Sequence, residues 1–400
     1  MRRDGRRIVT RPGHLGASHL IVGGGLAGGL AALALADAGL GPGVTLIESG
    51  GALGGDAGHT WSCHETDLDE DVRGLVMPLV AHRWPRQLVR FPGHERTLDT
   101  GYLTVTGERF AHLVRARLER AGVRLLFGAH AVEVGERKVR LADGQAIEAE
   151  LVLDARGPAR QTGAGAKHGF QKFVGLELAL ADDGPWQLPV VMDASVEQLE
   201  GFRFVYVLPF SRRHVLVEDT VYADDGLIDT DAYARRVVAY VEAHGARVGR
   251  VLRQEVGVLP LPLEDEPRPG AAPRGPLAIG YRGGFFHGVT GYSLPEAARV
   301  ARTVARARTR EETARALAAL AAARAGQRRF QRLLARLLFR ALPAPTRWTA
   351  LERFYRLPEE VIARFYASRS TAFDRARVLV GRPPAGISWR RLFGAAREAA

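Results

Sequence analysis

Three glycines and one acidic residue near the N-terminus have the types and the spacing that hold a dinucleotide. Gly23, Gly25 and Gly28 follow the apolar segment 19–22 and precede an alanine- and leucine-rich segment. In a strand-to-helix turn, such glycines permit a tight bend, a close approach to a pyrophosphate and close packing of the helix on the strand. Glu48 ends the next apolar segment, where a carboxylate can bond ribose hydroxyls. The pattern predicts a βαβ unit for FAD or NAD rather than NADP, although an ordinary glycine-rich turn is the alternative.

Two later segments favour FAD over NAD. Asp154 and Gly157 lie where the apolar segment 151–153 runs into a glycine turn, and Gly280 follows the apolar segment 277–279. Each is a strand-to-glycine junction that can return to the same cofactor. A long FAD molecule needs such distal contacts, so we predict an FAD site.

Two adjacent carboxylates, Glu218 and Asp219, end the apolar segment 215–217. Successive side chains of a strand point to opposite faces, so only one of the two can face a given pocket. A carboxyl group against apolar walls has a raised pKa and can hold or accept a proton. The alternative is a solvated strand end.

An aromatic strand precedes these carboxylates. The segment 202–209 alternates, so that Phe202, Phe204, Tyr206 and Leu208 share one face and Arg203 lies on the other. A strand with apolar groups on both faces is typical of a protein core, and it also suits an apolar tunnel.

Hydrophobic periodicity and turn residues predict the remaining elements. We expect a loop at 50–71, helices at 107–121 and 231–244, a hairpin of 202–208 with 214–220, and helices from Pro295 to about Arg377; short strands are expected at 123–127, 131–134, 138–141 and 146–150, and a buried strand at 151–154. This order predicts an α/β fold, in which an antiparallel-sheet substrate domain interrupts a Rossmann-type FAD-binding domain and a helical C-terminal region follows. The expected boundaries are 18–168 and 271–310 for the FAD-binding domain, 169–270 for the substrate domain and 311–400 for the C-terminal region.

The charge of the chain is concentrated at its C-terminal end. Residues 301–400 hold 22 basic and 7 acidic residues, a net charge of +15 against −3 for residues 1–300. Clustered positive charge suits an anionic membrane or a polyphosphate. The helices of this region also carry apolar and aromatic residues, which favours partial embedding in a membrane.

The location expected from the sequence is cytoplasmic and peripheral on the inner membrane face. Residues 1–19 are basic and polar without the apolar core of a signal peptide, and no apolar stretch approaches the roughly 18 residues of a spanning helix. Cys63 is the only cysteine, so an intramolecular disulfide is excluded and no metal site is expected.

Six segments in this order resemble the bacterial lycopene cyclase family, from about Leu20 to Pro384. The His-Thr-Trp and Thr-Gly-Tyr-Ser-Leu-Pro strings are more specific than a glycine fingerprint. The segments are 23–30, His59–Ser62, Gly201–Pro209, Glu218–Thr220, Phe286–Pro295 and the pair 353–355 and 364–366. The chain departs from the family's usual pattern at 28–29, in the longer loop 55–59, and at Gly288, which follows His287 where the family has His-Pro.

The resemblance implies conversion of lycopene and related linear carotenes to β-carotene by way of γ-carotene, with reduced FAD as cofactor and NAD(P)H as electron source. Glu218 would be the essential carboxylate and Asp219 a second candidate that strand parity makes structural. The match places further residues at the flavin, namely Gly288, Thr290 and Gly291, and others at the substrate, namely His59, Trp61, Phe204, Tyr206, His287 and Tyr292.

Two other functions fit parts of the sequence. A flavin-dependent monooxygenase or a prenyl or carotenoid reductase would share the cofactor domain but consume reducing equivalents. A peripheral membrane or nucleic-acid binding protein would use the basic tail alone. The FAD pattern argues against the second, and we expect no nucleic-acid partner.

Overall fold

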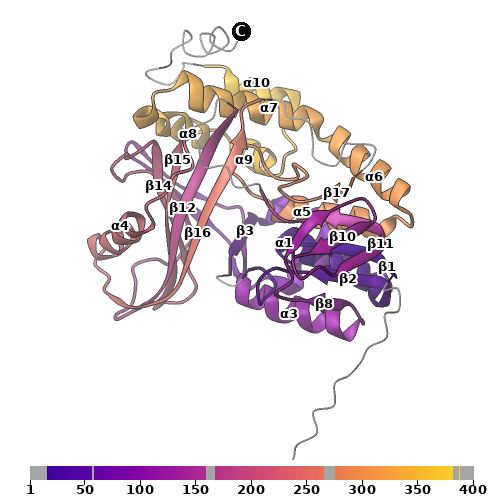
Figure 1. The fold of residues 1–400 in the computed structure, drawn as a ribbon. Coiled ribbons are helices and arrows are strands. Elements are labelled where there is room, and N and C mark those ends of the chain that lie inside the picture. Colours follow the sequence, from indigo (N-terminus) through magenta and orange to yellow (C-terminus); the bar gives the residue numbers. More distant parts are fainter. Residues whose placement is uncertain (1–15, 56–57, 159–166, 265–274, 382–386, 388–400) are drawn as a thin grey trace, which may run out of the picture.

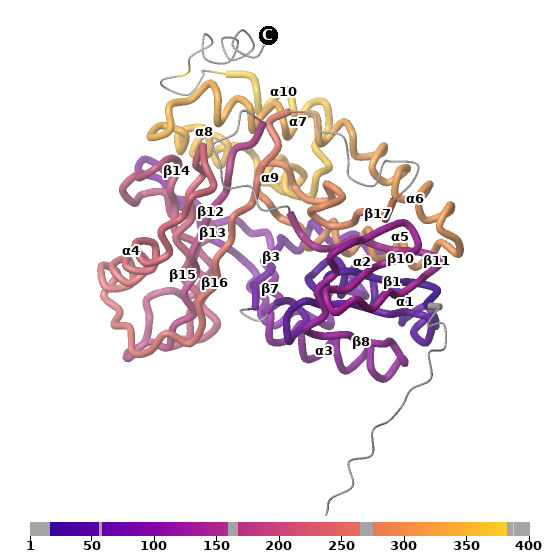
Figure 2. The backbone as a smooth tube through the Cα atoms, viewed as in Figure 1, coloured from indigo at the N-terminus to yellow at the C-terminus, as the bar shows by residue number. Residues whose placement is uncertain are grey.

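The computed structural model describes residues 16–55, 58–158, 167–264, 275–381 and 387 of the 400-residue chain. Two lobes lie side by side, one built on a mainly parallel sheet and the other on an antiparallel sheet (Figure 1). The C-terminal helices run across the top of both lobes in this view, as the backbone trace also shows (Figure 2). This architecture confirms the predicted fold class.

The first sheet contains the predicted βαβ unit. β1 pairs in parallel with β2 on one side and with β11 on the other, and β17 pairs in parallel with β11. The strand order is β8-β2-β1-β11-β10-β9, with β17 off this path. The strands are β1 (Gly16–Val22), β2 (Val44–Ile47), β8 (Arg124–Leu126), β9 (Ala131–Val134), β10 (Lys138–Leu141), β11 (Ala146–Asp154) and β17 (Leu277–Ala278).

β17 returns to this sheet after more than a hundred residues that build the other lobe. Leu153 lies beside Leu277, and Asp154 lies beside Ala278. Helix α1 (Leu26–Asp37) and helix α5 (Leu294–Arg306) bury their apolar residues in the same core. The first lobe is therefore interrupted in sequence and continuous in space, as predicted for a Rossmann-type domain.

The second sheet forms the other lobe, with the order β16-β12-β15-β14-β13-β5-β6. Its strands are β5 (Gln87–Phe91), β6 (His94–Leu98), β12 (His168–Leu180), β13 (Val190–Asp193), β14 (Phe202–Pro209), β15 (His214–Ala223) and β16 (Val248–Pro262). The predicted hairpin is confirmed by the antiparallel pairing of β14 with β15. The domain boundaries given above stay a prediction. β5 and β6, which lie at residues 87–98, belong to this second sheet although they precede residue 169.

The two faces of the second sheet differ. Helix α4 (Thr230–Ala243) packs on one face, where Val215, Val217 and Val221 of β15 meet its apolar residues. The other face carries Leu216 and Tyr222 and packs against the C-terminal helices. The alternation of β14 and β15 thus follows the parity predicted from the sequence.

A three-stranded sheet lies between the lobes and corrects one prediction. β3 (Thr60–His64) and β4 (His82–Trp84) flank β7 (Tyr102–Thr106). The expected loop 50–71 therefore contains a strand, and helix α2 (Glu70–Val76) begins within it. The loop prediction was wrong because β3 is stabilised by pairing with β7, about forty residues further along the chain, and not by a local apolar pattern.

Helices follow the returning strand, as predicted. They are α5, α6 (Arg310–Ala323), α7 (Ala325–Arg336) with a π-helical turn (Leu337–Ala341), α8 (Trp348–Tyr355), α9 (Glu359–Tyr366) and α10 (Ala372–Leu379); α3 (Gly107–Arg120) belongs to the first lobe. Phe354, Tyr355, Phe365 and Tyr366 are buried in the core of the second lobe. None of the helices in the described part of the chain has the length and apolar content that crossing a bilayer requires.

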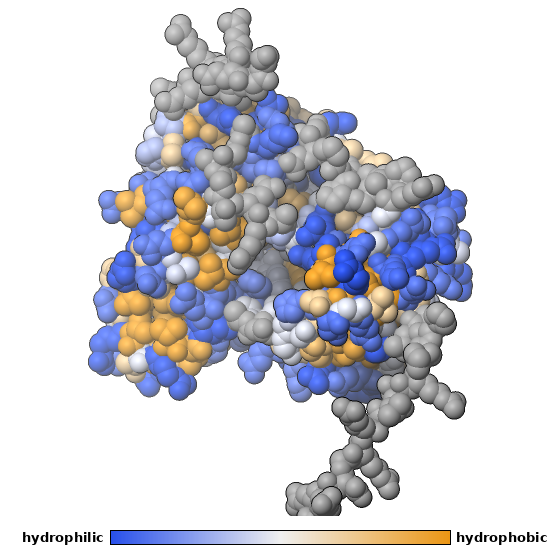
Figure 3. Space-filling view, viewed as in Figure 1, coloured by the Kyte–Doolittle hydropathy of each residue, from blue (hydrophilic) through white to orange (hydrophobic). Residues whose placement is uncertain are grey.

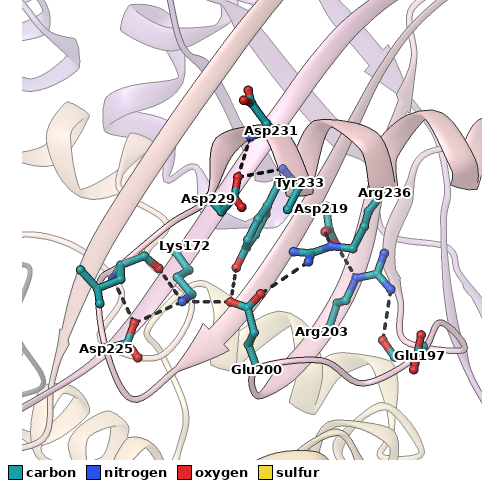
Figure 4. Close-up of polar contacts among 12 residues, drawn as sticks. Lys172, Glu197, Glu200, Arg203, Asp219, Asp225, Asp229, Asp231, Tyr233 and Arg236 are labelled. Atoms are coloured by element: carbon teal, nitrogen blue, oxygen red, sulfur yellow. Dashed lines mark hydrogen bonds and ion pairs between the residues drawn. The ribbon is translucent and has the colours of Figure 1, made fainter.

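Asp219 is the centre of an ionic cluster between the second sheet and helix α4 (Figure 4). Its side chain is fully buried, and its two oxygens accept hydrogen bonds from Arg203 of β14 (2.6 Å) and from Arg236 of α4 (2.5 Å). The same cluster continues through Glu200 to Lys172 of β12. Asp219 therefore ties two strands and the covering helix together.

We expect Asp219→Asn to lower the free energy of unfolding by about 3 kcal/mol, because it leaves the buried guanidinium group of Arg203 without its counter-charge and removes the nearer of two from Arg236. Denaturant titration followed by circular dichroism measures this loss. Asp183→Asn is the control, since Asp183 pairs with Arg212 and Arg213 at the surface, and it should leave the unfolding midpoint nearly unchanged. Equal midpoints for Asp219→Asn and the parent would contradict a stabilising role for the cluster.

Candidate functional site

One cavity of about 660 Å³ runs from the glycine turn of the first lobe to the aromatic face of the second. In the space-filling view the surface is hollowed between the two lobes (Figure 3). Most of the predicted site residues line this cavity: Gly23, Gly25, Glu48, His59, Trp61, Gly157, Phe204, Tyr206, Glu218, Gly280, Thr290, Gly291 and Tyr292. Five do not: Gly28, Asp154, Asp219, His287 and Gly288.

The three glycines of the first turn each have a separate steric role. Gly23 has a positive φ of 104°, and a Cβ atom there would lie 2.7 Å from the carbonyl oxygen of Ala155. A Cβ atom on Gly28 would lie 1.9 Å from the carbonyl oxygen of Gly23, so this glycine lets α1 pack on the turn. A Cβ atom on Gly25 would have nothing within 4 Å. The open space at Gly25, in front of the N-terminus of α1, fits a pyrophosphate.

The carboxylate of Glu48 is fixed beside this turn. One oxygen accepts a hydrogen bond from the Gly24 N–H (2.6 Å), and the other accepts one from the Gly50 N–H (2.8 Å). Glu48 is 9% exposed, and its exposed part faces the cavity. The carboxylate thus has the position that bonding to a ribose requires.

At the second predicted strand-to-glycine junction, the residues that follow Asp154 reach the cavity, and Asp154 itself does not. Asp154 is buried, and its two oxygens accept hydrogen bonds from the side chain of Arg156 at 2.9 and 2.8 Å. Arg156 and Gly157 line the cavity, and so does Gly280 of the third junction. Asp154 therefore orients Arg156 and does not itself reach the cavity.

Glu218 faces the opposite side of β15 from Asp219. It lines the cavity, and its carboxylate accepts a hydrogen bond from the Thr220 hydroxyl (2.6 Å). Glu218 is half-buried, and its exposed part faces this cavity. Burial, and next the nearby carboxylate of Glu255, raise the pKa of Glu218 to about 8. The carboxyl group is therefore mainly protonated at neutral pH.

Aromatic residues form the wall around Glu218. The Tyr206 hydroxyl donates a hydrogen bond to Ser62 Oγ (2.9 Å), and the Tyr102 hydroxyl is hydrogen bonded to those of Tyr206 (3.0 Å) and Tyr292 (2.6 Å). Burial raises the pKa of Tyr206, so its hydroxyl keeps its proton. Tyr206 and Tyr292 line the cavity, and Tyr102 lies behind them and joins their hydroxyls.

His287 and Gly288 shape the loop behind this wall. His287 is 2% exposed and lies 3.1 Å from the carbonyl oxygen of Phe365 through Nε2, while its Nδ1 is 2.9 Å from the Thr290 hydroxyl. Burial lowers the pKa of His287 to about 4, so the ring is neutral. The Gly288 N–H donates to Gln331 Oε1 (3.0 Å). Both residues position Thr290, Gly291 and Tyr292, which reach the cavity.

Several further residues line the cavity that the sequence alone did not identify. Those on the second sheet are Gln171 and Phe173 of β12, Val191 and Met192 of β13, Tyr222 of β15, and Gly257 and Leu259 of β16; Tyr281 and Tyr366 are among those from the C-terminal third. Tyr222 shares strand parity with Glu218, and this signal could have identified it. The others depend on pairings between distant segments.

The glycine turn gives a prediction with an internal control. We expect Gly25→Ala to weaken FAD binding by at least about tenfold while leaving apoprotein stability unchanged, because the added methyl group fills only the open space of the turn. Gly28→Ala should instead lower the free energy of unfolding by about 1–3 kcal/mol, because the methyl group overlaps the Gly23 carbonyl. Flavin fluorescence titration and thermal unfolding separate the two effects. Unaltered flavin affinity in Gly25→Ala would contradict the assignment of the turn.

Comparisons with known proteins agree with this geometry. The chain is 42% identical to the lycopene beta-cyclase of Paracoccus sp. over 91% of this chain and 94% of that protein. It is 39% identical to the lycopene beta-cyclase of Pantoea ananas over 92% of this chain and 95% of that protein. The solved flavin-dependent halogenase of Brevundimonas sp. BAL3 has the same fold, with a TM-score of 0.58 at 16% identity over 97% of this chain and 95% of that one.

A protein family also matches nearly the whole chain. The family described as lycopene cyclase protein matches residues 19–392. All the segments that carried the resemblance lie within the described residues, whereas positions 56 and 57 of the longer loop 55–59 lie outside them. The chain belongs to the lycopene cyclase family.

Proposed function

We propose that this chain is a lycopene β-cyclase, which closes β-ionone rings at the ends of lycopene to give γ-carotene and then β-carotene. The observation that carries the proposal is the position of the Glu218 carboxyl group, which faces an aromatic cavity continuous with a dinucleotide turn. The full-length similarity to bacterial lycopene beta-cyclases supports this choice among flavin enzymes.

Ring closure of a linear carotene is an isomerisation in which one proton enters and one leaves. Protonation of C2 in the terminal alkene gives a tertiary cation at C1. The C5–C6 alkene attacks this cation, and loss of the C6 proton completes the ring. The chemistry therefore needs an acid, an enclosed site and negative charge near the developing cation.

The residues of the cavity have the properties for these steps. Glu218 carries a proton at neutral pH and becomes a carboxylate after giving it up, so that one group can deliver the proton and then stabilise the cation. The rings of Phe204, Tyr206 and Tyr292 line the cavity beside it. Aromatic faces attract cations and do not bond to them covalently. Glu218 is thus the proposed catalytic residue, and Asp219 is structural.

FAD is the proposed cofactor, in its reduced form, with NAD(P)H as the source of electrons. Gly23, Gly25 and Glu48 would hold its pyrophosphate and ribose, and Gly157, Gly280, Thr290 and Gly291 line the further course of the cavity. Bound reduced FAD would supply electron density that stabilises positive charge in the cavity. His59 and Trp61 line the cavity between the glycine turn and the aromatic wall, beside the proposed substrate.

Expression in a lycopene-accumulating bacterium tests the function. We expect the parent chain to give β-carotene, with a mass equal to that of lycopene, and Glu218→Gln to lower the ring-closure rate about 10²–10⁴-fold while keeping its flavin. Chromatography with mass spectrometry reads both outcomes. Products that gain oxygen or hydrogen would identify a monooxygenase or a reductase, and a fully active Glu218→Gln would remove Glu218 from the mechanism.

We also propose that the C-terminal helices bind the surface of the inner membrane from the cytoplasm, because a carotene is supplied from lipid. Phe373 (70% exposed) and Leu379 belong to α10, and Val380 (71% exposed) follows it. Arg375 of α10 lies with its guanidinium carbon 5.7 Å from the ring centroid of Phe330 in α7, so these two helices form one surface. Exposed apolar residues among arginines are typical of helices that lie on anionic lipid.

The double change Phe373→Ser with Val380→Ser should weaken binding to phosphatidylglycerol vesicles by roughly tenfold, because two apolar anchors are lost. Cosedimentation with vesicles measures the binding. Val251→Ser with Leu252→Ser is the matched control, since these residues are also exposed but lie on β16, where apolar side chains show at the surface (Figure 3). If only the β16 variant loses binding, the membrane surface is the sheet edge and not the C-terminal helices.

A further inference from the structure

A second buried glutamate lies in the same cross-strand row as Glu218. β15 and β16 flank β12, and Gly175 of β12 is the register partner of both Glu218 and Glu255. Tyr206 of β14 is the register partner of Glu218 on its other side. Side chains in register share a face of the sheet, so the row Tyr206, Glu218, Gly175 and Glu255 lies on the cavity face.

The position in the middle of this row has no side chain. A Cβ atom on Gly175 would lie 3.0 Å from Glu255 Cγ and 3.2 Å from Glu255 Oε1. The side chain of Glu255 therefore lies over Gly175, in the direction of Glu218. Strands are about 4.8 Å apart, so a larger residue at position 175 would separate the two carboxyl groups.

The carboxylate of Glu255 is held in place from its other side. Glu255 is 2% exposed, and its Oε2 accepts hydrogen bonds from the Thr60 N–H (3.0 Å) and from Arg253 Nη1 (2.8 Å). Arg253 also binds Glu177 (2.9 Å). This ion pair makes Glu255 the charged member of the row, while Glu218 has Thr220 as its hydrogen-bond partner.

We infer that Glu255 is a positioning residue for ring closure, whose fixed negative charge across Gly175 keeps the proton on Glu218 until the substrate takes it. This inference rests on the proposed function. Two acidic groups that share one enclosed site do not both ionise readily, so the second keeps its proton. The charged and titratable groups that face or approach Glu218 are Glu255 and Arg253 of β16, Tyr206 of β14, and Asp219 behind the strand; Tyr292 and Tyr366 also line the cavity.

The rate of ring closure should depend on pH through the protonation of Glu218. The active form carries the proton on Glu218, so the rate falls as pH rises through the pKa of Glu218, near 8. In Glu255→Gln the negative charge is gone, while the amide oxygen can still accept from Thr60. The pKa of Glu218 then falls, and the alkaline limb of the pH–rate profile moves down by about one pH unit or more. The rate should be about fivefold lower or more at pH 8 and near parental at pH 6.

The decisive measurement is the titration of the Glu218 carboxyl group in flavin-loaded protein without substrate. Infrared difference spectroscopy with ¹³C-labelled glutamate detects the protonated carboxyl band, and loss of this band in Glu218→Gln assigns it. We expect the midpoint to fall in Glu255→Gln, to stay near parental in Glu255→Asp, which keeps the charge, and to stay parental in Glu177→Gln. The last is the matched control, because Glu177 also binds Arg253 but is not in the row.

A second variant covers the case in which Glu255→Gln does not fold. Removing the positive charge of Arg253, as in Arg253→Gln, should move the midpoint upward, because Arg253 lowers the pKa of Glu218. An unchanged midpoint in folded Glu255→Gln, or in Arg253→Gln if that is the folded variant, would overturn the inference. Since no substrate is present, these midpoints are independent of pigment production, so a chain that makes no β-carotene would overturn the proposed function and not the carboxyl pair.

Discussion

The alternation of side chains along β15 is the constraint on which the site depends. Glu218 and Asp219 are neighbours in sequence, yet one faces the cavity and the other faces α4. Asp219 meets two arginines, which compensate its charge away from water. Among the described residues no ion pair reaches Glu218, so its carboxyl group is more stable with a proton. A strand that places one acid in each environment thus separates the ion-paired carboxylate from the proposed catalytic one.

The cavity exists only because distant segments are brought together at the junction of the lobes. The His59–Trp61 segment lies over the second sheet because Arg253 donates hydrogen bonds to the Gly58 carbonyl (3.1 Å) and to the Thr60 hydroxyl (2.8 Å). On the opposite side, the loop that begins at Gly280 follows the pairing of β17 with β11. One wall of the site is therefore held by contacts between the lobes, and the other by a strand pairing within the first sheet.

Much of this arrangement could be predicted from local patterns. The glycine turn, Glu48 and the parity of Glu218 and Asp219 follow from short-range geometry, which a sequence contains directly. Glu255 and Tyr102 could not be found in this way. Glu255 lies in β16 among charged and half-exposed residues without a clear apolar alternation. Its place beside Glu218 depends on its register with Gly175 of β12. Tyr102 acts through hydroxyl partners more than a hundred residues away.

The tyrosine hydroxyls suggest how a reactive cation could survive in such a cavity. A carbocation is quenched by any oxygen that can form a bond to it, and tyrosine hydroxyls are abundant around Glu218. Several of these hydroxyls are hydrogen bonded to one another, however, as in the Tyr102, Tyr206 and Tyr292 cluster and in the Tyr355–Tyr366 pair (2.5 Å). The rings can then offer their faces, which stabilise positive charge without bonding to it. Hydrogen bonding among Tyr102, Tyr206 and Tyr292 thus holds their hydroxyl groups to one another and keeps the aromatic surface in place.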